Sequence, residues 1–128
     1  MSKSTIVVVE DEEDIFEVVR YNLEKEGFHV HGAFSGEIAQ QKITAHQPDL
    51  VLLDLMLPGI SGLDLCRKLK QQDDTRQIPI IMVTAKTEDS DIVAGLELGA
   101  EDYITKPFSP LVLIARVRSV LRRQKIGV

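Results

Sequence analysis

Short apolar runs alternate with amphipathic stretches along the whole chain. Five apolar runs predict strands, over residues 5–9, 28–33, 50–53, 78–83 and 102–105. Apolar residues that recur every three or four positions predict five helices, over residues 12–26, 35–46, 62–71, 88–98 and from residue 109 onward. Strands that alternate with helices through short connections favour a parallel sheet with helices on both faces and right-handed crossovers. The pattern therefore predicts one doubly wound α/β domain over residues 1–128.

The predicted strand over residues 50–53 is continuously apolar and ends in a charge. Its continuous apolar run is typical of a strand covered on both faces in the middle of a parallel sheet. The run ends on a carboxylate, Asp54, and Pro58-Gly59 then breaks the strand into a turn. A lone charge in this position is costly unless something nearby compensates it, and ligands bind at this edge of open α/β sheets. Asp54 therefore either starts a turn or belongs to a site.

The helical period also predicts which side chains face the core. On the first helix the inward stripe consists of Phe16, Val19 and Leu23. On the third helix it consists of Leu63, Cys66 and Leu69, and on the last helix of Leu113, Val117 and Leu121. The cations of the third helix are expected to point outward, and they are Arg67, Lys68 and Lys70.

Two surface features are expected beside this core. Ile15 and Val18 lie next to the inward stripe of the first helix, where they either widen the core face or form an apolar docking patch. The second strand alternates in character, which predicts an edge position. Its histidines, His29 and His31, are expected to be structural or to face solvent.

The composition is that of an ordinary soluble globular protein, with 44% hydrophobic and 27% charged residues. No run reaches the length of about 18 apolar residues that a membrane span needs, and the N-terminus has no signal-peptide profile. The single cysteine, Cys66, can form no internal disulfide and is expected to be a small, partly buried hydrophobic residue. We therefore expect a cytoplasmic protein that does not contact a membrane.

The net charge of -5 is unevenly distributed. Acidic residues fill positions 10–14, whereas the segment after Pro110 carries five cations and no acid. A basic terminal helix can bind nucleic acid, but this one lacks interleaved aromatic residues and the rest of the domain is acidic. The basic helix is therefore expected to contact protein, with no direct contact between these 128 residues and nucleic acid.

Polar residues stand at the carboxyl ends of four predicted strands, namely Glu10 and Asp11, Asp54, Thr84 and Lys106. These ends meet at one edge of a parallel sheet, so the side chains should converge. Clustered carboxylates repel one another, so at least one pKa should rise unless a cation is present. Carboxylate oxygens suit Mg²⁺, while Lys106 and Thr84 could contact phosphoryl oxygens. Asp54 is then placed as a nucleophile that forms an aspartyl-phosphate.

Two other sites found on such folds fit these residues less well. A flavodoxin-like FMN site needs a phosphate loop rich in Ser, Thr or Gly, where this chain has the acidic residues 10–14. A haloacid-dehalogenase-type phosphatase also uses an Asp nucleophile, but with a second Asp two positions later, where this chain has Met56. An aspartyl-phosphate here should therefore persist, which favours a switch over a phosphatase.

Several separated motifs resemble the receiver domain of two-component response regulators. They are Glu10-Asp11, residues 54–59 (DLMLPG), Thr84-Ala85 and residues 106–108 (KPF), and the resemblance covers essentially the whole chain. It implies a flavodoxin- or CheY-like fold with strand order 2-1-3-4-5, and Mg²⁺-dependent transfer of a phosphoryl group from a histidine kinase to Asp54. It implies a phosphoacceptor that catalyses its own phosphorylation and slow dephosphorylation, rather than an enzyme.

The resemblance also implies roles for individual residues. Mg²⁺ would be bound by Asp11, Asp54 and the backbone carbonyl of Met56, with Glu10 acting through water. The phosphoryl group would be contacted by Thr84, Lys106 and the Ala85 amide. Thr84 would move toward that group while Tyr103 turns inward. A cis peptide between Lys106 and Pro107, and histidine-kinase docking at Ile15 and Val18, are implied as well.

Residues 99–110 and the Arg-rich helix behind them look most like the OmpR/PhoB subclass. Its members carry a winged-helix DNA-binding domain after the receiver and dimerise through the fourth helix, fifth strand and fifth helix. Charge pairs could cross the two-fold axis between the acids Glu97, Glu101 and Asp102 and the bases Arg116, Arg118 and Arg122 or Arg123. Where the subclass often has an ion pair, this chain has Ile92 and Val112, so an apolar contact replaces the pair or the dimer differs.

Two outputs remain open from the sequence. The chain is either the regulatory half of a longer transcription regulator or a stand-alone receiver that relays phosphate. The motif over residues 99–110 favours the first.

Overall fold

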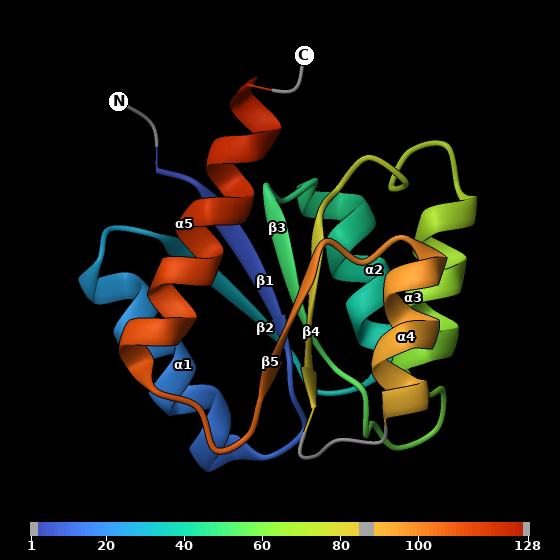
Figure 1. Ribbon diagram of the computed structural model, residues 1–128, viewed down its shortest axis with the longest axis horizontal. Helices are drawn as coiled ribbons and strands as arrows, with labels where there is room; N and C mark the ends of the chain where they lie inside the picture. Colours follow the sequence, from blue (N-terminus) through green and yellow to red (C-terminus); the bar gives the residue numbers. More distant parts are fainter. Residues whose placement is uncertain (1–2, 85–88, 127–128) are drawn as a thin grey trace.

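A five-stranded parallel sheet forms the centre of the computed structural model, which describes residues 3–84 and 89–126 (Figure 1). The strands are β1 (Thr5–Val9), β2 (His29–Ala33), β3 (Leu50–Asp54), β4 (Ile80–Thr84) and β5 (Asp102–Thr105). They lie in the order β2-β1-β3-β4-β5, and each neighbouring pair is parallel. The predicted doubly wound α/β fold and its strand order are confirmed.

Helices cover both faces of the sheet (Figure 1). They are α1 (Glu13–Lys25), α2 (Gly36–His46), α3 (Gly62–Gln71), α4 (Asp89–Leu98) and α5 (Pro110–Ile126). Helices α1 and α5 pack on one face, and α2, α3 and α4 pack on the other. Within the described residues, none of these helices is both long and apolar enough to cross a membrane.

Alternation along the strands divides the core into two layers. Val7 and Val9 face the layer under α2 and α3, whereas Ile6 and Val8 face the layer under α1 and α5. The central strand β3 is covered on both sides, so all five of its residues are buried. This double cover explains why the central strand is a continuous apolar run rather than an alternating one.

Two strands start later than the sequence predicts. Residue 28 was expected in the second strand, but the Phe28 N–H donates to the Leu23 carbonyl at 3.1 Å and so closes the end of α1. Residue 78 was expected in the fourth strand, but the Ile78 N–H donates to the Thr75 carbonyl at 3.0 Å in the preceding turn. In both cases a local turn uses the backbone donor that a strand would need. Glu88, the predicted start of the fourth helix, lies outside the described residues.

The prediction that Lys70 points outward is wrong. Its ammonium is largely buried and donates to the backbone carbonyls of Ile78, at 3.0 Å, and Arg76, at 3.2 Å. It also lies 3.5 Å from the Glu101 carboxylate. The turn after α3 brings free carbonyl groups over the end of this helix, and Lys70 satisfies them, so it ties α3 to the start of β4.

The predicted core faces of the helices are otherwise close to those observed. The first-helix stripe of Phe16, Val19 and Leu23 is buried. In α3 the buried side chains are Leu65, Cys66 and Leu69, while Leu63 is only partly buried. In α5 they are Leu113, Val117 and Val120, while Leu121 is partly buried. Cys66 is completely buried rather than partly so.

Candidate functional site

Three carboxylates converge at the carboxyl edge of the sheet. Glu10 follows β1, Asp11 follows Glu10, and Asp54 is the last residue of β3. Each offers a carboxylate oxygen within 4.8 Å of the others. Glu10 and Asp54 are each only 3% exposed, whereas Asp11 is open to solvent. The parallel topology therefore brings together the acids that the sequence placed at separate strand ends.

Lys106 reaches this cluster from the loop that follows β5. Its ammonium lies 2.9 Å from Glu10 Oε1 and 3.3 Å from Asp54 Oδ2, so it bridges the two buried carboxylates. The Lys106–Pro107 peptide bond is cis, as the resemblance implies. Among the residues that the structure describes, one cation thus stands against two buried carboxylates and a third exposed one.

Burial shapes the charge of this cluster. Removal from water, reinforced by the charge of Asp54 and opposed by the hydrogen bond from Lys106, raises the pKa of Glu10 from an ordinary 4.5 to about 7. Burial alone would lower the pKa of Lys106, but its hydrogen bond to Glu10 and the charges of Asp54 and Glu10 outweigh it, so that pKa is raised. The expectation that one carboxyl would titrate abnormally in the absence of a further cation agrees with this result.

The phosphoacceptor candidate Asp54 is held by the turn that follows it. Its Oδ1 accepts a hydrogen bond of 2.9 Å from the Met56 N–H, while the Met56 side chain is 72% exposed. Gly62, the first residue of α3, packs so closely that a Cβ there would lie 2.5 Å from the Asp54 carbonyl oxygen. From the sequence, Gly62 was predicted only as the first residue of a helix, and its close approach to Asp54 was missed. A glycine shortly after a candidate acid was the available signal that the backbone approaches closely there.

Thr84 ends β4 at the same edge of the sheet. The residue is buried, and its carbonyl accepts a hydrogen bond of 2.7 Å from the Lys106 N–H, which ties the ends of β4 and β5 together. The predicted phosphoryl contact at Ala85 lies outside the described residues. The described part of the predicted site therefore gathers Glu10, Asp11, Asp54, Thr84 and Lys106 at one edge.

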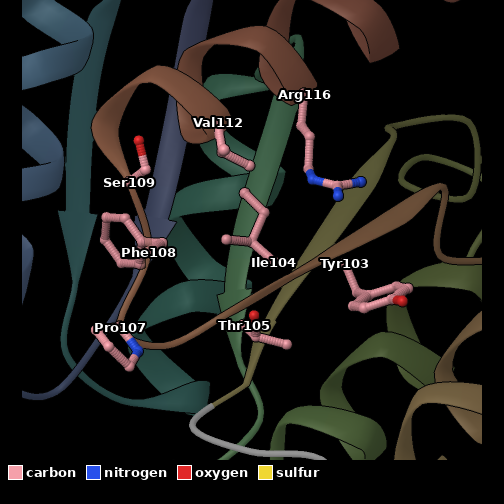
Figure 2. A pocket seen from close by; sticks show the side chains of 8 residues that line it. All are labelled: Tyr103, Ile104, Thr105, Pro107, Phe108, Ser109, Val112 and Arg116. Atoms are coloured by element: carbon pink, nitrogen blue, oxygen red, sulfur yellow. The ribbon is translucent and has the colours of Figure 1, made fainter.

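Tyr103, the predicted switch aromatic, lies on the edge strand β5. It is half-buried against the core layer under α3 and α4, and the Arg116 guanidinium lies 5.9 Å from the centre of its ring. Tyr103 and Arg116 both line a cavity of about 290 Å³ between β5 and the start of α5. Figure 2 shows the side chains that line it. Arg116 is also paired with Asp102 at 3.1 Å. The aromatic ring and the guanidinium thus share one surface.

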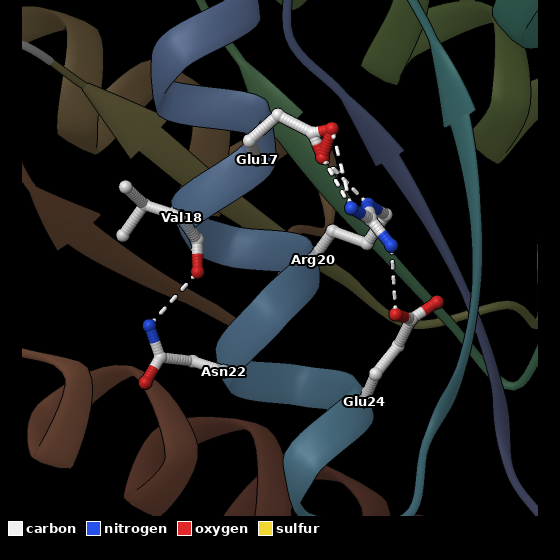
Figure 3. Close-up of polar contacts among 5 residues, drawn as sticks. All are labelled: Glu17, Val18, Arg20, Asn22 and Glu24. Atoms are coloured by element: carbon white, nitrogen blue, oxygen red, sulfur yellow. Dashed lines mark hydrogen bonds and ion pairs between the residues drawn. The ribbon is translucent and has the colours of Figure 1, made fainter.

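A shallow groove of about 450 Å³ lies beside the acidic cluster. Its walls come from α1 and from the loop after β5, and its lining consists of Asp14, Ile15, Val18, Lys106, Pro107 and Phe108. Val18 is 48% exposed, and it points away from the ion-paired cluster of Glu17, Arg20 and Glu24 on the same helix (Figure 3). The two apolar residues predicted beside the core stripe therefore form part of an open surface next to the site. Their role in docking stays a prediction.

Four of the charged residues predicted to pair across a dimer axis already have partners in the chain, and they are Glu101, Asp102, Arg116 and Arg118. Arg116 pairs with Asp102, Arg118 pairs with Glu26, and Glu101 accepts from the Ile80 N–H at 2.7 Å. Ile92 is half-buried and Val112 is 42% exposed. Pairs across a two-fold axis would therefore share or replace these contacts.

Comparison with known proteins agrees with this geometry. Residues 6–118 match the response regulator receiver domain. The chain is 52% identical over 120 residues to the phosphate regulon transcriptional regulatory protein PhoB of Rhizobium meliloti (strain 1021), covering 94% of this chain and 53% of that protein. It is 50% identical over 122 residues to the alkaline phosphatase synthesis transcriptional regulatory protein PhoP of Bacillus subtilis (strain 168), covering 95% of this chain and 50% of that protein.

A solved structure shows the same fold. The CheY-like response regulator receiver domain protein from Methanospirillum hungatei JF-1 superposes with a TM-score of 0.93 at 29% identity, covering 99% of this chain and 100% of that one. The chain spans about half the length of the two transcriptional regulators, which belong to the OmpR/PhoB subclass that the terminal motif resembles. The chain belongs to the response regulator receiver domain family.

Proposed function

We propose that residues 1–128 form a receiver domain that acts as a phosphorylation-activated switch, with Asp54 as the acceptor of a phosphoryl group from a sensor histidine kinase. The observation that carries the proposal is the placement of the Asp54 carboxylate. It is buried at the carboxyl edge of the sheet, 3.3 Å from the Lys106 ammonium and beside two further carboxylates. A buried nucleophile beside a fixed cation suits attack on an anionic donor.

The donor set fits Mg²⁺. Glu10, Asp11 and Asp54 offer carboxylate oxygens within 4.8 Å of one another, and hard oxygen donors are what this ion prefers. We assign Asp11, Asp54 and the backbone carbonyl of Met56 as ligands, with Glu10 acting through water. When bound, Mg²⁺ would supply positive charge that draws the donor phosphoryl group toward the acidic cluster.

The chain's own residues then account for the transfer. An Asp54 carboxylate oxygen attacks phosphorus, the P–N bond to the donor imidazole breaks, and the leaving imidazole nitrogen takes up a proton. Lys106 can balance the charge of one phosphoryl oxygen, because its ammonium already lies at Asp54 Oδ2. Thr84 and the Ala85 amide are proposed as the remaining contacts.

The acyl-phosphate formed in this way should persist. Two positions after Asp54 stands Met56, which is 72% exposed and carries no acid or base to activate water. We therefore infer a domain that catalyses its own phosphorylation and only slow dephosphorylation, rather than an enzyme that turns over substrate.

The output is proposed to follow from a change at β5. Thr84 ends β4 next to the acceptor, and Tyr103 lies on the neighbouring strand, where Met82 is its register partner. Phosphorylation would bias Thr84 and Tyr103 toward a second arrangement, which favours a homodimer through α4, β5 and α5. The similarity to PhoB and PhoP, each about twice as long as this match, supports control of a DNA-binding transcription regulator.

The experiment that tests this function supplies the protein with acetyl phosphate and counts covalent phosphoryl groups by intact-mass measurement. One phosphoryl group is expected with Mg²⁺, and none when EDTA replaces the ion. The Asp11→Asn variant should need more Mg²⁺ for the same yield. Asp14→Asn is the matched control. Asp14 is an exposed acid of the run over residues 10–14, but it does not belong to the group formed by Glu10, Asp11 and Asp54. Phosphorylation that is equal with and without Mg²⁺ would refute the metal-dependent function.

A further inference from the structure

All three histidines of the chain lie together on one side of the edge strand β2. The rings of His31 and His46 stack with their centroids 3.9 Å apart and their planes 15° from parallel. The ring of His29 meets that of His31 edge-on, with centroids 5.2 Å apart. The acidic cluster lies beyond the opposite, carboxyl end of the sheet, so these imidazoles form a separate group.

The folding pattern explains why they meet. On β2, His29 and His31 alternate in phase with Ala33, which is buried in the layer under α2. On α2, Ala39 and Ile43 face the same layer, and His46 follows Ile43 by three residues, so it continues that face beyond the end of the core. His29 and His46 are exposed and His31 is half-buried, so the group is open to solvent at the rim of the sheet.

We propose that His29, His31 and His46 form a binding site for a divalent transition-metal ion of the Zn²⁺ class. Imidazole nitrogen is a preferred ligand of such ions, and two or three of them with water complete a surface site. The stacked rings present their nitrogens in parallel planes, so one ring must turn before both bind the same ion. The exposed His46, in the last turn of α2, has the freedom to do so.

The protonation state of His31 favours binding. Burial, followed by the charges of His46, His29 and Lys42, lowers the pKa of His31, so its imidazole is neutral at pH 7 and keeps a lone pair for a metal. The Lys42 ammonium, which donates to the Gly32 carbonyl, lies close enough to oppose a bound cation. We therefore expect weaker binding than in a closed structural zinc site.

Two features separate this group from the acidic cluster. Imidazole nitrogens favour Zn²⁺, whereas the carboxylates of the acidic cluster favour Mg²⁺. The chain's one thiol, Cys66, is completely buried, so it does not compete for added metal in the folded protein.

The test is a calorimetric titration of the protein, made without a polyhistidine tag, with Zn²⁺ in the presence of excess Mg²⁺. One Zn²⁺ per chain is expected for the wild type, with affinity at least about tenfold lower in His31→Gln and in His46→Gln. Asp11→Asn is the matched control for the acidic cluster and should bind Zn²⁺ like the wild type. Circular dichroism of each variant checks that it is folded.

A second measurement does not depend on substitutions. In wild-type protein, the imidazole proton resonances of all three histidines should shift with one Zn²⁺ equivalent. The proposal is overturned if Zn²⁺ leaves those resonances unmoved, or if the doubly substituted His31→Gln, His46→Gln protein binds Zn²⁺ as tightly as the wild type. It is equally overturned if Asp11→Asn alone abolishes binding.

Discussion

Glu10 and Asp54 are two buried carboxyls that share one ammonium, that of Lys106. Such an arrangement leaves excess negative charge in a place where water cannot screen it well. The folded protein accommodates it by holding a proton on Glu10, whose pKa is raised to about 7. A bound divalent cation would remove the need for that proton, and this links metal binding at the site to proton release.

This linkage predicts how the stability of the metal-free protein depends on pH. The unfolded chain releases the Glu10 proton near its ordinary pKa of 4.5, whereas the folded protein keeps it until about 7. Between these two pKa values the folded state binds more protons than the unfolded chain. The contribution of Glu10 therefore favours the folded state most at pH values below this window, and the free energy of unfolding falls as pH rises through it. The contribution of Glu10 is at most about 3 kcal/mol.

Denaturant unfolding in EDTA, measured from below to above this pH window, checks the prediction. The Glu10→Gln variant keeps an oxygen that can accept from Lys106 but cannot titrate, so its stability should fall less with pH than that of the wild type. The same slope in both proteins would mean that Glu10 does not hold the proton.

For the helices and strands, periodicity predicted which faces are buried, and the strand ends predicted which polar residues converge. The convergence of Asp54, Thr84 and Lys106 could be predicted from the sequence, because every strand of a parallel sheet ends at the same edge. Periodicity gives the face of an element but not which positions meet along its length. The contact between His31 and His46 was therefore missed, although the strand of one and the helix of the other were predicted.

Lys70 shows the same limit. Its outward position was read from the helical period of α3, but its partners are backbone carbonyls in the following turn and a carboxylate beyond α4. Turn geometry of this kind leaves no periodic signal in the sequence. Through the observed contacts, Lys70 connects α3, β4 and the start of β5.

We predict that Lys70→Met destabilises the fold by about 1–3 kcal/mol, because it leaves buried carbonyl oxygens without a donor. Lys68→Met is the matched control on the same helix. Lys68 is exposed, so its substitution should change the free energy of unfolding by no more than about 0.5 kcal/mol. Denaturant titration of the two variants measures the difference, and equal stability would contradict the assignment of Lys70 as a structural link.

The groove between α1 and the loop after β5 gives a further prediction. A charge at Ile15, as in Ile15→Asp, should slow phosphoryl transfer from a histidine kinase by about tenfold or more, since docking loses an apolar contact. Phosphorylation by acetyl phosphate should be unchanged, because that donor needs no groove. Val93→Asp, an exposed apolar position on α4, is the control and should leave both rates unchanged. Equal loss with both donors would place the defect in the site instead of the groove.

In the whole molecule, the proposed acceptor site and the proposed dimer face are connected through β4 and β5. Thr84 and Thr105 are register partners at the ends of these strands, and Lys106 follows directly. The face of β5 and α5 carries the Asp102–Arg116 pair and the partly exposed Val112. A shift at the acceptor therefore has a short covalent and hydrogen-bonded route to the surface proposed for dimerisation.

Sedimentation with and without beryllofluoride, as a phosphoryl analogue, tests that coupling. We expect a monomer without the analogue and a dimer with it. Val112→Asp should weaken the dimer by about tenfold, because it introduces a charge into an apolar contact, while Val18→Asp on α1 should leave it intact. A monomer under both conditions would rule out dimerisation driven by phosphorylation.

We propose that Asp54 itself carries the phosphoryl group. The most direct measurement treats the protein with acetyl phosphate and Mg²⁺, reduces the acyl-phosphate with borohydride, and locates the reduced residue by peptide mass spectrometry. We predict reduction at Asp54, no labelling in Asp54→Asn, and normal labelling in Asp49→Asn, an exposed acid just before the same strand. Labelling at Asp11 or Glu10, or undiminished labelling of Asp54→Asn, would contradict it.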